Sequence, residues 1–202
     1  MAYLDEDIAR MLRNERKKEK LKMEQEQLKK EMESIDEEKI ATDMEKGFCV
    51  VLDREFKFQQ KNILANKMQV FLPDGNLIER CNFAEIYTAG DDRYEMGINY
   101  VLAQEKEEFQ SWEVYKTNME EGLKKSKIRF NWIEEGCILN RQIKLHYLEY
   151  LTTTGMGVIH NHMYMADLGE ERLTVNLNYL DKDQKYWKVL VKIMMDKMQW
   201  LG

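Results

Sequence analysis

Residues 156–179 have the sequence MGVIHNHMYMADLGEERLTVNLNY, and this stretch decides the fold class. Apolar and polar side chains alternate from Leu173 to Tyr179, as in a β-strand with one buried face. A turn is expected at Leu168-Gly169-Glu170, because glycine tolerates the backbone angles of tight connections. The stretch therefore predicts an antiparallel hairpin made of strands at 156–166 and 171–179.

The strand pattern continues upstream of this hairpin. Strands are expected at 127–135 and 138–151, with short connections at Glu135-Gly136 and Thr154-Gly155. Together the four strands form an antiparallel meander. The strand at 138–151 is apolar on both faces, so both faces of the sheet should be covered. Either helices lie on both sides, or the N-terminal arm folds back over one face.

Further strands and two helices complete the domain. Period-two patterns fall near 48–52, 56–58, 68–72 and 94–102. Apolar residues at steps of three or four predict amphipathic helices at 107–125 and from 183 to the C-terminus. The predicted fold class is α+β, an antiparallel β-sheet flanked by helices and preceded by a long charged N-terminal helix or helical pair.

This order of elements resembles the PsbP-like α/β/α sandwich family, which includes photosystem accessory subunits and small adaptor proteins. The resemblance covers residues 48–200. It rests on the sequence of strands, helix, meander and closing helix, the last beginning at Tyr186-Trp187, and no motif can be transferred residue by residue. The resemblance implies a non-catalytic accessory protein, and the charged N-terminal segment departs from it.

The first 46 residues differ in composition from the rest of the chain. They contain 11 Lys or Arg, 14 Asp or Glu, and no Gly or Pro, and many are strong helix formers. The sequence therefore predicts two parts, a charged helical arm at 1–46 and an α+β sandwich domain at 47–202. The arm is one helix, or two helices if residues 34–38 break it and supply a new N-cap.

The apolar residues of the arm form two short patches. In the best heptad frame only six of the twelve a and d positions are apolar, fewer than a self-sufficient coiled coil needs. Such a helix needs a partner surface to be firmly ordered. That surface is a partner helix, a second copy of the chain, or the sheet of its own domain. The predicted protein-binding residues are Leu4, Ile8, Met11, Leu21, Leu28, Met32 and Ile35.

Composition excludes several classes of function. The formal net charge is −6, and glutamates interrupt the one basic run at 13–20, so nucleic-acid binding is not expected. No long apolar window and no N-terminal apolar region occur, so we expect a cytoplasmic protein without membrane insertion. The three widely spaced cysteines, Cys49, Cys81 and Cys137, are expected to be reduced and mostly buried.

His160 and His162 are two residues apart in a predicted strand, so both could reach one metal ion. His146 joins them if the hairpin loop has three residues, Thr154-Gly155-Met156, whereas a two-residue loop places it on the opposite face. Glu149 is the nearby acidic residue. Without an assured third ligand, ordinary sheet-face histidines are expected, with no bound metal and no other cofactor.

The sequence contains none of the common phosphate-loop, dinucleotide, hydrolase or metalloprotease motifs. The predicted function is a non-enzymatic protein–protein interaction module, an accessory or structural subunit of a larger assembly that docks through its arm. Two alternatives are open. One is a cytoplasmic chaperone or immunity-type protein that binds a secreted partner, and the other is a metal-dependent enzyme using His146, His160 and His162.

Overall fold

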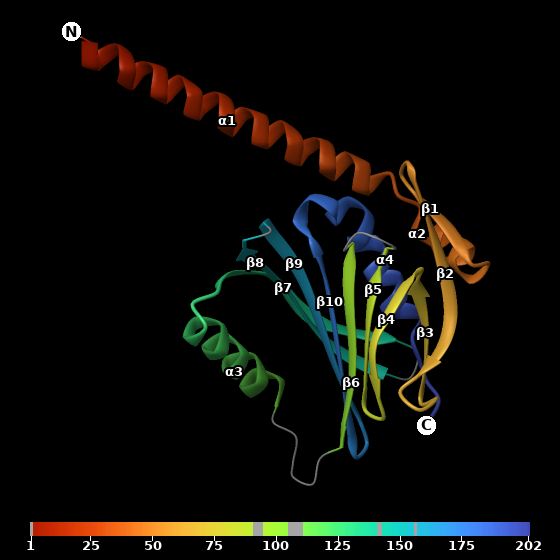
Figure 1. Cartoon of the computed structure of the whole chain (residues 1–202). Coiled ribbons are helices and arrows are strands. Elements are labelled where there is room, and N and C mark those ends of the chain that lie inside the picture. The colour runs from red at the N-terminus through yellow and green to blue at the C-terminus, as the bar shows by residue number, and fades with distance from the viewer. Residues whose placement is uncertain (1, 91–94, 105–110, 141–142, 156) are drawn as a thin grey trace. The chain divides into compact units, whose positions relative to one another are not determined.

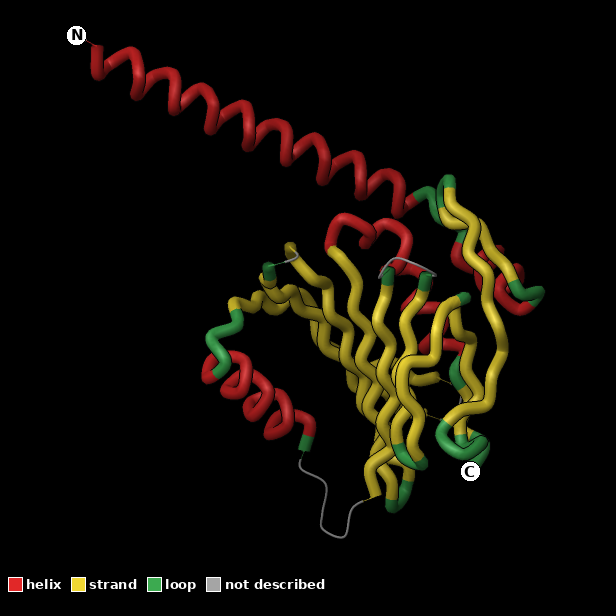
Figure 2. Tube along the Cα trace, viewed as in Figure 1, coloured by secondary structure: helices red, strands yellow, loops and turns green. Residues whose placement is uncertain are grey.

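The computed structural model describes residues 2–90, 95–104, 111–140, 143–155 and 157–202 (Figures 1 and 2). The side chains of residues 2–11, 21, 24 and 25 also lie outside the described part. The chain divides into two compact units, Met1–Asp36 and Glu37–Gly202.

The first unit consists of helix α1 (Ala2–Glu33) and the short segment that follows it. The helix ends at Ser34, whose backbone N–H donates to the carbonyls of Lys30 and Glu31, each at 3.2 Å. The Ser34 hydroxyl also donates to the Glu31 carbonyl, at 2.7 Å. These bonds satisfy carbonyl groups that the end of a helix leaves without partners.

Helix α2 (Glu37–Glu45) belongs to the second unit. Its Met44 is fully buried and its Ile40 is 5% exposed. Lys192 Nζ lies 2.7 Å from Glu37 Oε2, which links α2 to helix α4 (Gln184–Lys197). The boundary between the units therefore follows residue 36, ten residues before the boundary predicted from charge density. Composition failed here because the charged residues of α2 lie on its exposed side, whereas two apolar residues enter the core.

The second unit contains two antiparallel sheets (Figure 2). The small sheet has the order β1-β2-β3-β11, with bounds Phe48–Val51, Arg54–Ile63, Met68–Pro73 and Gln199–Trp200. The large sheet has the order β4-β5-β6-β10-β9-β8-β7. In chain order its strands are Gly75–Cys81, Ala84–Ala89, Met96–Gln104, Arg129–Asn140, Ile143–Thr154, Gly157–Leu168 and Glu171–Leu180. The predicted antiparallel meander, β7 to β10, is confirmed.

Helices α3 (Trp112–Lys125) and α4 cover opposite faces of the large sheet (Figure 1). His146 and Glu149 are three residues apart in β8, so their side chains point to opposite faces. The ring of Trp112 in α3 stacks on His146, with centroids 5.6 Å apart. Lys188 of α4 donates to Glu149 at 2.8 Å. The large sheet therefore has one helix on each face.

The two helices are held with different strength. Helix α4 buries seven side chains: Trp187, Val189, Leu190, Val191, Ile193, Met194 and Met195. The Asn140 amide donates to the carbonyls of Met195 and Met198, at 2.5 and 2.7 Å, at the end of that helix. None of the described side chains of α3 is buried. The apolar stripe predicted for it is Phe109, Trp112, Tyr115, Met119 and Leu123; Phe109 lies outside the described part, and the other four side chains are only half-buried.

The turn predicted at Glu135-Gly136 is wrong, because β7 continues through both residues. Residues 141 and 142, which would connect β7 to β8, lie outside the described part. A glycine is needed here because the ring of Tyr147, on the neighbouring strand, lies close to the backbone. A Cβ at Gly136 would lie 2.8 Å from Cε1 of Tyr147. A glycine that looks like a turn in the sequence is thus a strand residue packed beneath an aromatic ring.

The β8–β9 hairpin has a register that neither predicted loop gives. Thr154 pairs with Gly157, and Glu149 pairs with His162. The connection is therefore residues 155 and 156, of which 156 lies outside the described part. This register places His146 on the face opposite His160 and His162, as the two-residue alternative also does, because paired residues share a face.

Candidate functional site

The predicted protein-binding residues lie in or just after α1. The side chains of Leu4, Ile8, Met11 and Leu21 are outside the described part. Leu28, Met32 and Ile35 are half-buried. Two further apolar side chains of α1 are exposed, Leu12 at 49% and Met23 at 70%.

A buried polar cluster lies between the large sheet and α4. It contains Glu149 from β8 and His160 and His162 from β9, all at most 5% exposed. The β8–β9 register places Glu149 directly opposite His162, and His160 is on the same face two residues away. A donor atom from each of the three residues lies within 4.8 Å of the other two. Elsewhere in the described chain no similar group of His, Cys, Asp or Glu donors occurs.

Glu149 is ionised in this cluster. Burial acts to raise its pKa, but hydrogen bonds from His160 Nε2 at 2.5 Å and Lys188 Nζ at 2.8 Å outweigh burial and lower the pKa to about 2. Both bonds converge on the same oxygen, Oε1. The carboxylate is therefore a charged acceptor held by donors from the sheet and from α4.

His162 is a neutral imidazole. Burial, the largest influence, lowers its pKa to about 3. Its Nε2 lies 2.8 Å from the Tyr179 hydroxyl, and its ring stacks on that of His160 with centroids 5.0 Å apart and planes inclined by 6°. At neutral pH one of its ring nitrogens therefore carries a free or hydrogen-bonded lone pair.

The second nitrogen of His160 is in an unusual position. Nδ1 is buried and makes no hydrogen bond, although Oδ1 of Asp181 is only 3.3 Å away. Because Nε2–H donates to Glu149, a neutral ring has its Nδ1 lone pair facing the Asp181 carboxylate. A proton on Nδ1 would instead point at that carboxylate, so this nitrogen lacks a partner only in the tautomer with the proton on Nε2.

The set of three histidines considered from sequence does not form. His146 lies on the α3 face, where it stacks on Trp112, and Glu149 takes the third place in the cluster. Sequence reasoning identified Glu149 as the nearby acid but missed Tyr179, Asp181 and Lys188. The period-two pattern that ends at Tyr179 indicates that this side chain lies on the buried face of its strand. Lys188, in contrast, reaches the site only because α4 packs on the sheet.

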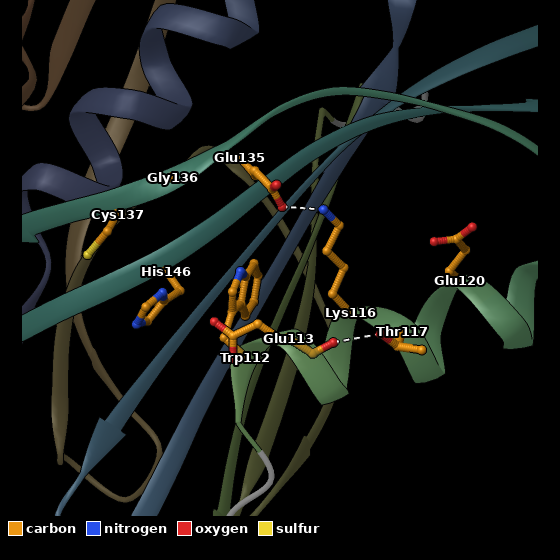
Figure 3. A pocket seen from close by; sticks show the side chains of 9 residues that line it. All are labelled: Trp112, Glu113, Lys116, Thr117, Glu120, Glu135, Gly136, Cys137 and His146. Carbon is orange, nitrogen blue, oxygen red and sulfur yellow. Dashed lines mark hydrogen bonds and ion pairs between the residues drawn. The ribbon is translucent and has the colours of Figure 1, made fainter.

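A second feature is an open cavity of about 590 Å³ between α3 and the edge of the sheet (Figure 3). Lys116 of α3 pairs with Glu135 across it. Cys137 and His146 line its other end, where they are direct cross-strand neighbours. Cys137 is exposed, so the burial expected for the thiols is wrong for this residue.

The other two thiols differ from Cys137. Cys49 is buried, as predicted, and burial raises its pKa to about 12. Cys81 is half-buried. Alternation along β7 places Cys137 on the face of the sheet that α3 covers. Because α3 is loosely packed at this edge of the sheet, the side chain of Cys137 is exposed.

Among the described residues, no helix has the length and apolar character needed to span a bilayer.

Comparison with known proteins shows a likeness in structure only. No family model matches this sequence, and no curated protein matches it. The solution structure of cyanobacterial PsbP (CyanoP) from Synechocystis sp. PCC 6803 superposes with a TM-score of 0.55 at 11% identity. The match covers 71% of this chain and 92% of that chain.

Two bacterial structures are more distant. PA94 from Pseudomonas aeruginosa, a protein of unknown function, has a TM-score of 0.47 at 12% identity and covers 70% of this chain and 94% of its own. LpqN of Mycobacterium tuberculosis, involved in cell envelope biogenesis, has a TM-score of 0.43 at 10% identity, with 71% and 83% covered. Because the match to cyanobacterial PsbP includes most of both chains, the α+β part of this protein has a PsbP-like fold, as the order of its elements predicts.

Proposed function

We propose that this protein is a non-enzymatic interaction protein, an accessory or structural subunit that docks through its N-terminal helix. The observation that carries the proposal is α1 itself. It is a helix of 32 residues in a compact unit separate from the sandwich, and the side chains of residues 12–20 are all exposed. A helix without tertiary packing is marginal in water, so a long charged helix of this kind needs a partner surface.

The C-terminal half of α1 and the residues after it supply the contact. Leu21, Leu28 and Met32 follow one another at steps of seven and four, which places them on one stripe of α1, and Ile35 follows just after the helix ends. Each such side chain contributes about 1.5–3 kcal/mol when fully buried, before the costs of association and ordering are subtracted. A stripe of this width fits an amphipathic helix, from another protein or from a second copy of this chain.

The test compares four proteins: the full chain, residues 37–202, the full chain with Leu28→Ser, Met32→Ser and Ile35→Ser, and a control with Arg16→Ser and Lys17→Ser. Their assembly is measured by sedimentation velocity and by crosslinking mass spectrometry in an extract of source cells. We expect assembly by the full chain and the control, because exposed ion pairs contribute only about 0–1 kcal/mol. The truncated chain and the apolar triple variant should both fail to assemble. If residues 37–202 retain every contact of the full chain, the arm has no docking role.

A further inference from the structure

The Glu149, His160 and His162 donors have the composition of a metal-binding site. Two imidazole nitrogens and one carboxylate oxygen are a common set of three protein ligands for Zn²⁺, with one position left for another ligand. The three donor atoms already lie within 4.8 Å of one another. Ligands at about 2.0–2.2 Å from a tetrahedral ion are about 3.4 Å apart, so the donors are close enough in distance. Binding requires the stacked rings of His160 and His162 to turn until their lone pairs point at one position.

The groups around the donors also suit a metal. In metal sites, a histidine ligand usually donates its other N–H to a carboxylate or a similar acceptor, which fixes its orientation. Asp181 is such a group for His160: its Oδ1 is 3.3 Å from Nδ1, the buried nitrogen that makes no hydrogen bond. If Nε2 bound a metal, the proton would reside on Nδ1 and point at the Asp181 carboxylate. Tyr179 is the corresponding partner for His162, at 2.8 Å.

The site is already adapted to a cation. The ammonium group of Lys188 occupies a position 2.8 Å from Glu149 Oε1. Its side chain is 33% exposed, whereas that of Glu149 is 4% exposed, so Lys188 can move into solvent while the carboxylate cannot.

We propose that Glu149, His160 and His162 bind one Zn²⁺ ion in place of the Lys188 ammonium, and that the ion stabilises the sheet beneath α4. Zn²⁺ is favoured over Fe²⁺ because an iron site with the same donors keeps several open positions, and three donors that are at most 5% exposed leave little room for additional ligands. The sequence predicts no metal because the third ligand depends on strand register, and the register supplies Glu149. This site is independent of docking through the arm.

The test begins with the full chain without an affinity tag, since the natural sequence has only three histidines. After treatment with a chelator and its removal, the protein is titrated with ZnCl₂, FeCl₂ under anaerobic conditions, and MgCl₂. We expect one Zn²⁺ per chain with a dissociation constant of about 1 µM or lower, weaker binding of Fe²⁺, no binding of Mg²⁺, and a rise in Tm with added Zn²⁺. Absence of stoichiometric Zn²⁺ binding would overturn the proposal.

Variants locate the ion. Glu149→Gln and His162→Asn should each weaken Zn²⁺ binding by about 100-fold or more, and Lys188→Met should strengthen it because the competing ammonium is removed. His146→Asn is the matched control, since His146 is in the same hairpin but on the other face. Cys137→Ser tests the rival surface pair of Cys137 and His146. Binding that is lost in either control and kept in Glu149→Gln would place the ion in the α3 cavity and refute the buried site.

X-ray absorption spectroscopy of the Zn²⁺-loaded wild-type chain gives an answer even if a buried variant does not fold. Two imidazole ligands with an oxygen and no sulfur are expected. One imidazole, or any sulfur ligand, contradicts the proposal, because the structure brings only His160 and His162 together.

Discussion

Helix α2 should be part of the folding unit, and two truncations test this directly. Residues 37–202 retain α2, whereas residues 47–202 lack it. Met44 is fully buried and Ile40 is 5% exposed, so removing α2 leaves both of their positions in the core empty. The ion pairs of Glu37 with Lys192 and of Glu45 with Lys197 are lost as well. We expect 37–202 to fold cooperatively and 47–202 to be strongly destabilised.

The size of the effect follows from burial. Removing a buried Met or Ile side chain costs about 2–5 kcal/mol, so the loss of two costs on the order of 4–10 kcal/mol. Exposed ion pairs add little. Single domains have a free energy of unfolding of about 5–15 kcal/mol, so 47–202 should lie at the edge of stability. From charge density alone 47–202 would be expected to fold, and the burial of α2 reverses that expectation.

Urea denaturation followed by circular dichroism measures the difference. A point variant gives a milder form of the test: Met44→Ala in the full chain should cost about 2–5 kcal/mol and lower the Tm by several degrees. Met32→Ala in α1 is the matched control and should change the stability of the sandwich by less than about 0.5 kcal/mol. Equal urea midpoints for the two truncations, or equal effects of the two Met substitutions, would refute this account of α2.

Three further predictions concern single residues of the sandwich. An alkylating reagent should label Cys137 in the native protein before any other thiol, because Cys137 is exposed. Mass spectrometry compares the labelling of the native wild type with that of Cys137→Ser, and equal labelling of the two proteins would contradict the prediction. Gly136→Ala should lower the free energy of unfolding, measured by urea denaturation, by about 1–3 kcal/mol, because the alanine Cβ would lie 2.8 Å from an aromatic ring on β8. An unchanged free energy of unfolding would mean that the ring moves away freely. A hydrogen bond from Lys67 lowers the pKa of Glu171. The pair therefore stabilises the fold at a pH above the ordinary carboxyl pKa, and this stabilisation is lost as the pH falls through the lowered pKa of Glu171. Lys67→Met should therefore raise the pKa of Glu171 toward its ordinary value in an NMR titration, and an unchanged pKa would exclude the pair as the cause.

Local pattern predicts much of this fold. The strands at 157–168 and 171–180 follow from alternation and from one glycine turn, and α4 follows from its apolar stripe. The failures occur where a residue has a role that depends on distant neighbours. Gly136 is interpreted as a turn because its reason, the ring of Tyr147, is on another strand.

The candidate site shows the same limit more strongly. That His160 and His162 share a face follows from their spacing alone. That Glu149 faces them, and His146 does not, depends on the register of one hairpin. Lys188 comes from a helix 39 residues further along the chain and reaches Glu149 only when the sandwich is assembled. The sequence therefore predicts that His160 and His162 share a face, but it does not predict that Glu149 is the third donor.

The unequal burial of α3 and α4 has a consequence for local unfolding. Helix α4 opens only when seven buried side chains leave the core, so its amide hydrogens should exchange by global unfolding. Helix α3 buries none of its described side chains and can leave the sheet at a small fraction of that free energy. Its departure would expose the face that carries His146, where Leu148, Met163 and Met165 are buried in the closed molecule. The native ensemble should thus include a minor state in which an apolar strip of the sheet is open to solvent while the core on the α4 side stays intact.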